Sequence, residues 1–142
     1  MIKARLAAPA DAASLKRMNA AFNEVEDRTE EEIARNLQHS PEIVVIAESQ
    51  GSAVGFCCAQ VHHSFCYPQP VAEVTEMYVD PDFRGKGAAQ KLLSFLEAHL
   101  IEIHHVDEMH LLTGLQNRSA RRAYEKAGFA VHQELYMVKH LR

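Results

Sequence analysis

The hydrophobic positions at the start of the chain predict a strand followed by a helix. Residues 2–7, IKARLA, look like a short first strand. Leu15, Met18 and Phe22 then recur at intervals of three and four residues, which is typical of one face of a helix. Asp11 stands where a side-chain oxygen can cap this helix.

A capping signal and two apolar residues predict a second helix. Thr29 and Glu32 have the T-x-x-E spacing of a capping box, and Ile33 and Leu37 follow on one face. Pro41 closes the helix, because proline cannot continue helical hydrogen bonding.

The spacing of the hydrophobic residues then shortens, which predicts three consecutive strands. Residues 43–48, 53–62 and 71–79 are rich in Val, Ile, Cys and Tyr, which indicates extended backbone. Gln50-Gly51 lies between the first two stretches and predicts a hairpin turn.

The second half of the chain returns to helical spacing. Residues 85–103 predict a long helix, 109–113 a strand, 118–127 a helix ended by Gly128, and 129–140 one or two final strands. The apolar face of the long helix consists of Leu92, Leu93, Leu96, Leu100 and Ile103.

This order of elements predicts an α/β (α+β) fold with a mixed, mostly antiparallel sheet. The 142 residues, of which 47% are hydrophobic, are about the length of one ordinary domain. A chain of this length buries roughly 70% of its unfolded surface. We therefore expect residues 1–142 to form a single domain.

Composition and charge narrow the classes of partner. The formal net charge of −4, without a block of Lys or Arg, disfavours nucleic acid and anionic lipid. The longest aliphatic run, residues 43–47, is too short to cross a membrane, and no apolar signal segment opens the chain. We expect a cytoplasmic protein with reduced cysteines. His62-His63 and His104-His105 lack the spacing of a helical metal site, so no metal is expected.

The stretch DPDFRGKGAAQKLL, residues 80–93, joins a predicted strand to the long helix. A helix start offers free N–H groups and the positive end of the helix dipole, which together attract anions. Gly85 and Gly87 allow close approach to the backbone, and Arg84 and Lys86 add positive charge. The stretch is compatible with a pyrophosphate site and also with a plain tight turn.

Two common phosphate-binding motifs do not fit this stretch. A P-loop requires GxxxxGK followed by Ser or Thr, whereas Lys86 lies between the glycines and no hydroxyl follows. A dinucleotide-binding GxGxxG would need its third glycine at Gln90.

Two segments carry a family resemblance. VDPDFRGKGAAQKLL resembles the acetyl-CoA signature of the GNAT acetyltransferase superfamily, Q/R-x-x-G-x-G/A, through Arg84, Gly87 and Ala89. NRSARRAYEKAGF, residues 117–129, is similar to the family's N-x-x-A-x-x-x-Y-x-x-x-GF pattern. The order of predicted elements agrees with the family's fold over essentially the whole chain.

The resemblance implies the GNAT acyl-CoA N-acyltransferase fold, with six to seven strands and about four helices, and an acetyl-CoA-dependent N-acetyltransferase. It implies that the fourth and fifth strands splay apart to admit the thioester. Its cofactor contacts fall on Met77, Tyr78 and Val79 for pantetheine, on Arg84, Gly85, Lys86, Gly87, Ala88 and Ala89 for pyrophosphate, and on Asn117.

The resemblance also places the catalytic groups. Tyr124 matches the family's general acid, and a phenol can donate a proton to a thiolate of comparable basicity; alternatively, it is a core tyrosine. Glu73 lines up with the glutamate that some members use as base, whereas Glu76 and a bound water stay open. Strand alternation predicts that Glu73 and Glu76 face opposite sides, unless a bulge changes the parity.

The acceptor is predicted only by class. The acidic segment EVEDRTEEE, residues 24–32, would attract a cationic amine, or it is an exposed helix start. We expect direct attack by a primary amine of a small molecule, with protein acetylation and a non-catalytic acyl-CoA sensor as alternatives. The resemblance also allows a homodimer, because family members often dimerise. Residues that could line an acceptor pocket are Phe22, Asn23, Phe65, Cys66 and Tyr67.

Overall fold

The computed structural model describes residues 1–142 and consists of a five-stranded sheet with four α-helices. The elements in chain order are β1 (Ile2–Leu6), the 3-10 turn η1 (Pro9–Asp11), α1 (Ala12–Asn23), α2 (Glu30–His39), β2 (Ile43–Ser49), β3 (Ser52–His62), β4 (Val71–Val79), the 3-10 turn η2 (Pro81–Phe83), α3 (Ala88–His104), β5 (Met109–Leu111) and α4 (Arg118–Lys126).

The strands lie in the order β1-β2-β3-β4-β5. β1 to β4 pair antiparallel with their neighbours, and β4 pairs parallel with β5 only where residues 72–74 meet residues 109–111. Gln50 and Gly51 join β2 to β3 with φ angles of 50° and 81°, the left-handed backbone that fits a twisted hairpin. The predicted mixed, mostly antiparallel sheet is confirmed.

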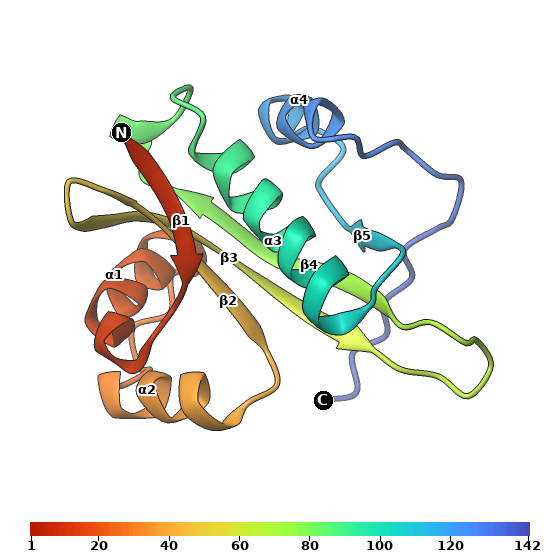
Figure 1. The fold of residues 1–142 in the computed structure, drawn as a ribbon, viewed down its shortest axis with the longest axis horizontal. Helices are drawn as coiled ribbons and strands as arrows, with labels where there is room; N and C mark the ends of the chain where they lie inside the picture. Colours follow the sequence, from red (N-terminus) through yellow and green to blue (C-terminus); the bar gives the residue numbers. More distant parts are fainter.

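Helices cover both faces of the sheet (Figure 1). α3 packs on one face, where Leu92, Leu96 and Leu100 belong to the larger core cluster. α1 lies on the opposite face, where Leu15 and Met18 join the smaller cluster and α2 packs beside them. The sheet thus separates two cores. None of the helices combines the length and the apolar character needed to cross a bilayer.

The final strands predicted at residues 129–140 do not form, so the sheet has five strands and not six to seven. After Phe129 the chain makes no backbone hydrogen bond and continues as a coil to the C-terminus (Figure 1). The edge strand beside which they would pair is β5. It spans three residues and is too short to hold a long strand beside it. The apolar residues of this segment therefore lie exposed.

Of the two residues predicted to cap α1 and α2, only the one at α2 caps its helix. The capping box of α2 is confirmed, because Thr29 Oγ1 accepts from Glu32 N and Glu32 Oε1 accepts from Thr29 N, both at 3.1 Å. Asp11 does not cap α1. Its carboxylate instead accepts from Ala8 N at 2.7 Å and from two nitrogens of Arg5 at 2.8 Å, and the bond from Arg5 lowers the pKa of Asp11.

Candidate active site

The turn before α3 has an open face. Gly85 and Gly87 have φ angles of +75° and +87°, a left-handed backbone that strains any residue with a Cβ. A Cβ built at either glycine would meet no atom within 4 Å. Gly87 is also the cap residue of α3, and no side chain caps the first turn. The N–H groups of that turn therefore face space that an anionic ligand can enter.

The two predicted cationic side chains flank this turn. Arg84 is exposed, and its Nε donates to the carbonyl oxygen of Val79 at 2.9 Å. Its guanidinium lies 5.9 Å from the centre of the Tyr78 ring, and Lys86 Nζ lies 5.4 Å from the centre of the Phe83 ring. Arg84 thus ties the turn to the end of β4.

β4 and β5 separate next to the turn. Their pairing ends at Val74 and Leu111, whereas β4 continues to Val79. Met77 and Val79 pack toward α3, and the Tyr78 ring packs on the opposite face with Phe56. The splayed strands that the resemblance implied are present, and Met77, Tyr78 and Val79 lie on the part of β4 that pairs with β3 but not with β5.

One polar atom stands out at the inner end of this opening. Thr75 is the first residue of β4 beyond the pairing with β5, and it has no partner in the register with β3 either. Its Oγ1 is the only buried side-chain nitrogen or oxygen in the chain without a hydrogen-bond partner. A buried hydroxyl without a partner carries a desolvation cost.

α4 holds Asn117 and Tyr124 in place. Asn117 caps the helix, because its side-chain oxygen accepts from Ala120 N at 3.2 Å, and its side-chain amide donates to no protein atom. The helix ends in a Schellman motif, in which Gly128 N and Phe129 N donate to the carbonyls of Glu125 and Tyr124 at 3.0 Å. The Asn and Gly-Phe positions of the sequence pattern are therefore the two caps of α4.

Tyr124 lies between these caps and is half-buried. Its ring meets the Phe129 ring edge to face, with centroids 5.9 Å apart. Gln90 Nε2 of α3 donates to the carbonyl oxygen of the neighbouring Ala123 at 2.9 Å, which fixes α4 against α3. Burial, with a smaller contribution from Cys57, raises the pKa of Tyr124. The phenol is therefore protonated at neutral pH and can serve as a proton donor.

Glu73 and Glu76 face the same side of the sheet, so the prediction of opposite faces was wrong. Ala72, Val74 and Met77 all pack toward α3. In a regular strand every second residue faces the same side, so the three-residue step from Val74 to Met77 contains one extra residue. The extra residue is a bulge opposite Cys58 and Ala59 of β3. Both carboxylates consequently point away from α3, toward the face that α1 and α2 cover.

The two carboxylates have different partners on that face. Glu73 Oε1 lies 3.3 Å from His62 Nε2, and His110 of β5 is its register neighbour. Glu76 Oε1 accepts from Asn23 Nδ2 at 3.0 Å, at the end of α1. The bond between Glu76 and Asn23 ties β4 to the start of the acidic segment at residues 24–32.

Of the predicted pocket residues, two lie at this face and three do not. Phe22 packs against the rings of Phe56 and Tyr78, and Asn23 contacts Glu76. Phe65, Cys66 and Tyr67 are exposed in the loop between β3 and β4. Sequence reasoning missed the contact of His62 with Glu73. The antiparallel order of β3 and β4 was a signal for it, since the connecting loop brings the end of β3 beside the start of β4.

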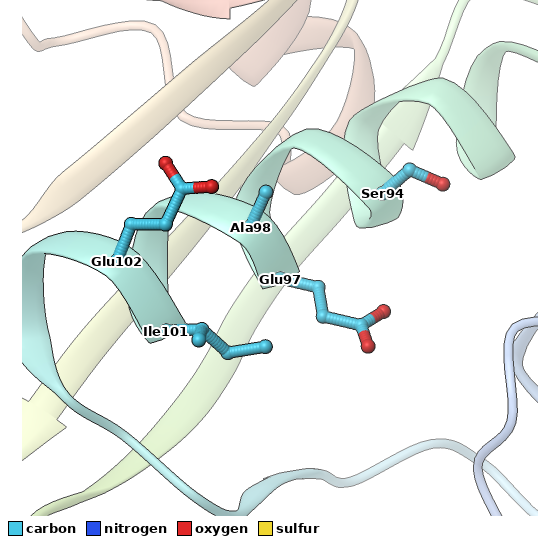
Figure 2. A pocket seen from close by; sticks show the side chains of 5 residues that line it. All are labelled: Ser94, Glu97, Ala98, Ile101 and Glu102. Carbon is cyan, nitrogen blue, oxygen red and sulfur yellow. The ribbon is translucent and has the colours of Figure 1, made fainter.

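Two hollows of the surface lie away from these residues. One of about 300 Å³ is lined by side chains of α3 alone, and Figure 2 shows them: Ser94, Glu97, Ala98, Ile101 and Glu102. Another of about 410 Å³ lies beside α2. The chain contains no group of three or more His, Cys, Asp or Glu side chains placed to hold a metal ion.

Comparison with known proteins agrees with this geometry. The sequence profile of the Acetyltransferase (GNAT) family matches residues 12–129. Acetyltransferase YE1169 of Yersinia enterocolitica is 30% identical over 114 residues, which are 79% of this chain and 74% of the relative.

Two solved structures share the fold. An aminoglycoside acetyltransferase from an uncultured soil metagenomic sample, in complex with sisomicin, has a TM-score of 0.85 at 18% identity and covers 99% of this chain and 97% of its own. Aminoglycoside N-acetyltransferase AAC(6')-Iy in complex with CoA has a TM-score of 0.83 at 18% identity, covering 100% and 96%. With both sequence motifs in place around the splayed strands, the chain belongs to the GNAT family and is an acetyl-CoA-dependent N-acetyltransferase.

Proposed function

We propose that the protein transfers the acetyl group of acetyl-CoA to a primary amine of a small molecule by direct attack of the amine. One observation carries this proposal: the open glycine turn at the start of α3 follows the stretch of β4 that does not pair with β5, and Glu76 on that stretch and Glu73 just before it both point to the face opposite α3. Donor and acceptor thus approach one strand from different directions.

The donor side rests on backbone groups. The amides of residues 84–89 and the charges of Arg84 and Lys86 bind the pyrophosphate of CoA, and the unpaired edge at Met77, Tyr78 and Val79 binds the pantetheine arm. Asn117 binds CoA through its side-chain NH₂ group, which donates no hydrogen bond to a protein atom. Acetyl-CoA supplies an acetyl group that is activated as a thioester.

Two side chains move protons in the proposed reaction. Glu73 accepts a proton from the ammonium group, since an amine attacks only when its lone pair is free. Tyr124 donates its phenolic proton to the departing sulfur, and its raised pKa keeps that proton in place until the thiolate forms. Glu76, fixed by Asn23, binds a positive charge of the acceptor.

A small acceptor with positive charge fits this face best. Exposed carboxylates at Glu24, Glu26, Asp27, Glu30 and Glu31 follow Asn23 directly, and a field of one sign concentrates ligands of the opposite sign. The structural neighbours bound to an aminoglycoside or its analogue support the same class of acceptor.

A screen of amines tests this function. Purified protein with acetyl-CoA is given aminoglycosides, polyamines, amino acids and lysine-containing or N-terminal peptides, and CoA release is measured. We expect turnover with at least one small cationic amine. Turnover with peptides only would contradict the small-molecule acceptor. Binding of acetyl-CoA without turnover on any amine would favour a non-catalytic acyl-CoA module.

The oligomeric state and location stay predictions. A homodimer is supported by the exposed apolar side chains of the C-terminal segment, since large exposed apolar patches mark interaction surfaces; they are Val131, Leu135, Tyr136, Met137, Val138 and Leu141. Light scattering of the intact protein measures the mass directly. The cytoplasmic location is supported by three free cysteines, of which Cys57 and Cys58 are buried.

A further inference from the structure

The carboxylate of Glu73 is held by one protein group. Its Oε1 lies 3.3 Å from Nε2 of His62, the last residue of β3, and no other side chain bonds to it. Gln60 stands directly opposite Glu73 on β3, and His110 stands beside it on β5, yet neither bonds to the carboxylate. His62 is therefore the side chain that restrains Glu73.

This contact crosses the strand pair diagonally. His62 is the register partner of Val71, so its ring leans along β4 by two residues to reach Glu73. Diagonal neighbours in an antiparallel pair lie about 7–8 Å apart, a gap that only long side chains bridge. The backbone register alone therefore does not bring the ring and the carboxylate together.

A gain in stability does not account for the contact. The side chain of His62 is 51% exposed and that of Glu73 is 30% exposed. Pairs in contact with water add little to stability, because water screens their charges. The bond therefore matters more for where the carboxylate points than for folding.

The charge of the carboxylate determines which atom carries the hydrogen. An ionised carboxylate only accepts hydrogen bonds, so His62 carries its hydrogen on Nε2 and donates it to Oε1. The other oxygen of Glu73, Oε2, has no protein partner. A general base needs such a free oxygen within hydrogen-bond reach of the proton that it removes.

We propose that His62 is a positioning residue for Glu73: its Nε2–H holds Oε1 and thereby directs Oε2 to the ammonium group of the acceptor. This inference rests on the proposed function, because it takes Glu73 to be the base. In this step an N–H bond of the ammonium group breaks, the proton joins Oε2, and the electron pair stays on the nitrogen that attacks the thioester. His62 neither gains nor loses a proton.

The benefit of this bond lies in the freedom that it removes. A glutamate side chain samples many rotamers, and fixing it costs entropy. A base that is already oriented when the amine arrives has met that cost in advance, which raises the rate of proton transfer.

Three single variants test the hydrogen bond with the best acceptor of the amine screen. His62→Leu removes the donor, whereas His62→Gln keeps an N–H donor at a similar reach. His63→Leu is the control, because His63 is the next residue, is exposed and bonds to no side chain. We expect kcat to fall about tenfold in His62→Leu and to recover to within about threefold in His62→Gln. His63→Leu should change kcat less than about twofold.

Two outcomes of this comparison would overturn the inference. One is an unchanged kcat in His62→Leu. The other is a loss that His62→Gln does not recover, because the imidazole ring and not its N–H donor would then be needed.

Further measurements separate positioning from damage to the fold. In His62→Leu the melting temperature should shift by less than about 3 °C. The Kd of acetyl-CoA and the KM for the amine should change less than about twofold, because only the proton transfer is slowed. His62 also lies at the opposite end of β4 from the glycine turn. Weaker binding of acetyl-CoA, or a large fall in the melting temperature, would mean that the substitution disturbs the fold and would overturn the positioning role.

A double variant tests whether His62 acts through Glu73. In protein that already carries Glu73→Gln, His62→Leu should change the residual kcat less than about twofold, because no carboxylate is left to position. A further tenfold loss would show that His62 acts independently of Glu73 and would overturn the inference. If Glu73→Gln shows no measurable turnover, the single variants decide.

Failure of the natural protein to acetylate any amine would sink the proposed function and this inference together. Turnover by the natural protein, combined with full activity of Glu73→Gln or of His62→Leu, would sink the inference and leave acetyl transfer intact.

Discussion

Gly51 and Gly87 both have a left-handed backbone conformation, in different parts of the fold. Their φ angles are +81° and +87°, and a Cβ added at either position would meet no atom within 4 Å. Gly51 lies in the β2–β3 hairpin, whereas Gly87 borders the proposed pyrophosphate site. Any difference between alanine substitutions at these positions therefore reports on ligand binding and not on backbone strain.

We expect Gly87→Ala to weaken CoA binding about tenfold, because the added methyl group occupies the space above the amides. Gly87→Ala and the control Gly51→Ala should both lower the free energy of unfolding by about 1–2 kcal/mol, the cost of a left-handed residue with a Cβ. Calorimetric titration with CoA and urea unfolding measure the two effects. Equal CoA affinity in both variants would contradict the proposed site.

Tyr124→Phe tests the general acid. We expect kcat to fall by about 10²-fold or more, with little change in the Kd of acetyl-CoA, because only the proton donor is lost. Burial raises the pKa of Tyr124, so the protonated acid is present below that raised value and is lost above it. In the natural protein kcat should therefore decline only at a pH above that at which an ordinary tyrosine ionises. An unchanged kcat in Tyr124→Phe across pH would refute the assignment.

The two carboxylates of β4 can be separated by matched substitutions. Glu73→Gln should lower kcat strongly, because it removes the proposed base. Glu76→Gln should mainly raise KM for the amine, because it removes a charge that binds the acceptor but keeps a partner for Asn23. Steady-state kinetics with the best acceptor decide the matter, and the reverse pattern would move the base to Glu76.

The elements of the fold could be predicted where signals are local. The spacing of Leu92, Leu96 and Leu100 gave the long helix, and the glycine turn gave the first hairpin, because each depends on neighbouring residues only. The bulge at Thr75 could not be predicted in the same way. It depends on how β4 pairs with β3, and one extra residue reversed the side to which Glu76 points.

The capping box of α2 gives a prediction at the scale of this element. Thr29→Ala removes the acceptor of the Glu32 N–H and should lower the free energy of unfolding by about 1 kcal/mol. Thr29→Ser keeps the oxygen and should restore most of that loss. Urea unfolding provides the measurement. Equal stability of the alanine and serine variants would mean that the cap is replaced by water at no cost.

At the scale of the whole molecule, the sequence predicted the fold class and the motifs better than it predicted the number of strands in the sheet. Residues 129–140 contain the apolar run from Leu135 to Val138, which is compatible with a buried strand. Such a strand needs a partner of matching length, and β5 offers three residues. The site shows the same limit: motifs singled out Gly87 and Tyr124 in the sequence, but the irregular pairing at Thr75 became visible only in the sheet.

The two cores provide a test of the single domain predicted for residues 1–142. Leu96 is fully buried on the α3 face and Met18 on the α1 face, yet β2 and β3 supply residues to both clusters. Because the shared strands cannot keep one core after losing the other, both cores should unfold in one transition.

Leu96→Ala and Met18→Ala should each lower the free energy of unfolding by about 2–5 kcal/mol, whereas Leu115→Ala, at an exposed site, should change it little. Calorimetry should give equal calorimetric and van't Hoff enthalpies in every variant. If Met18→Ala instead split the transition into two, the face of the proposed acceptor site would be a separate folding unit, able to open while the face covered by α3 stays folded.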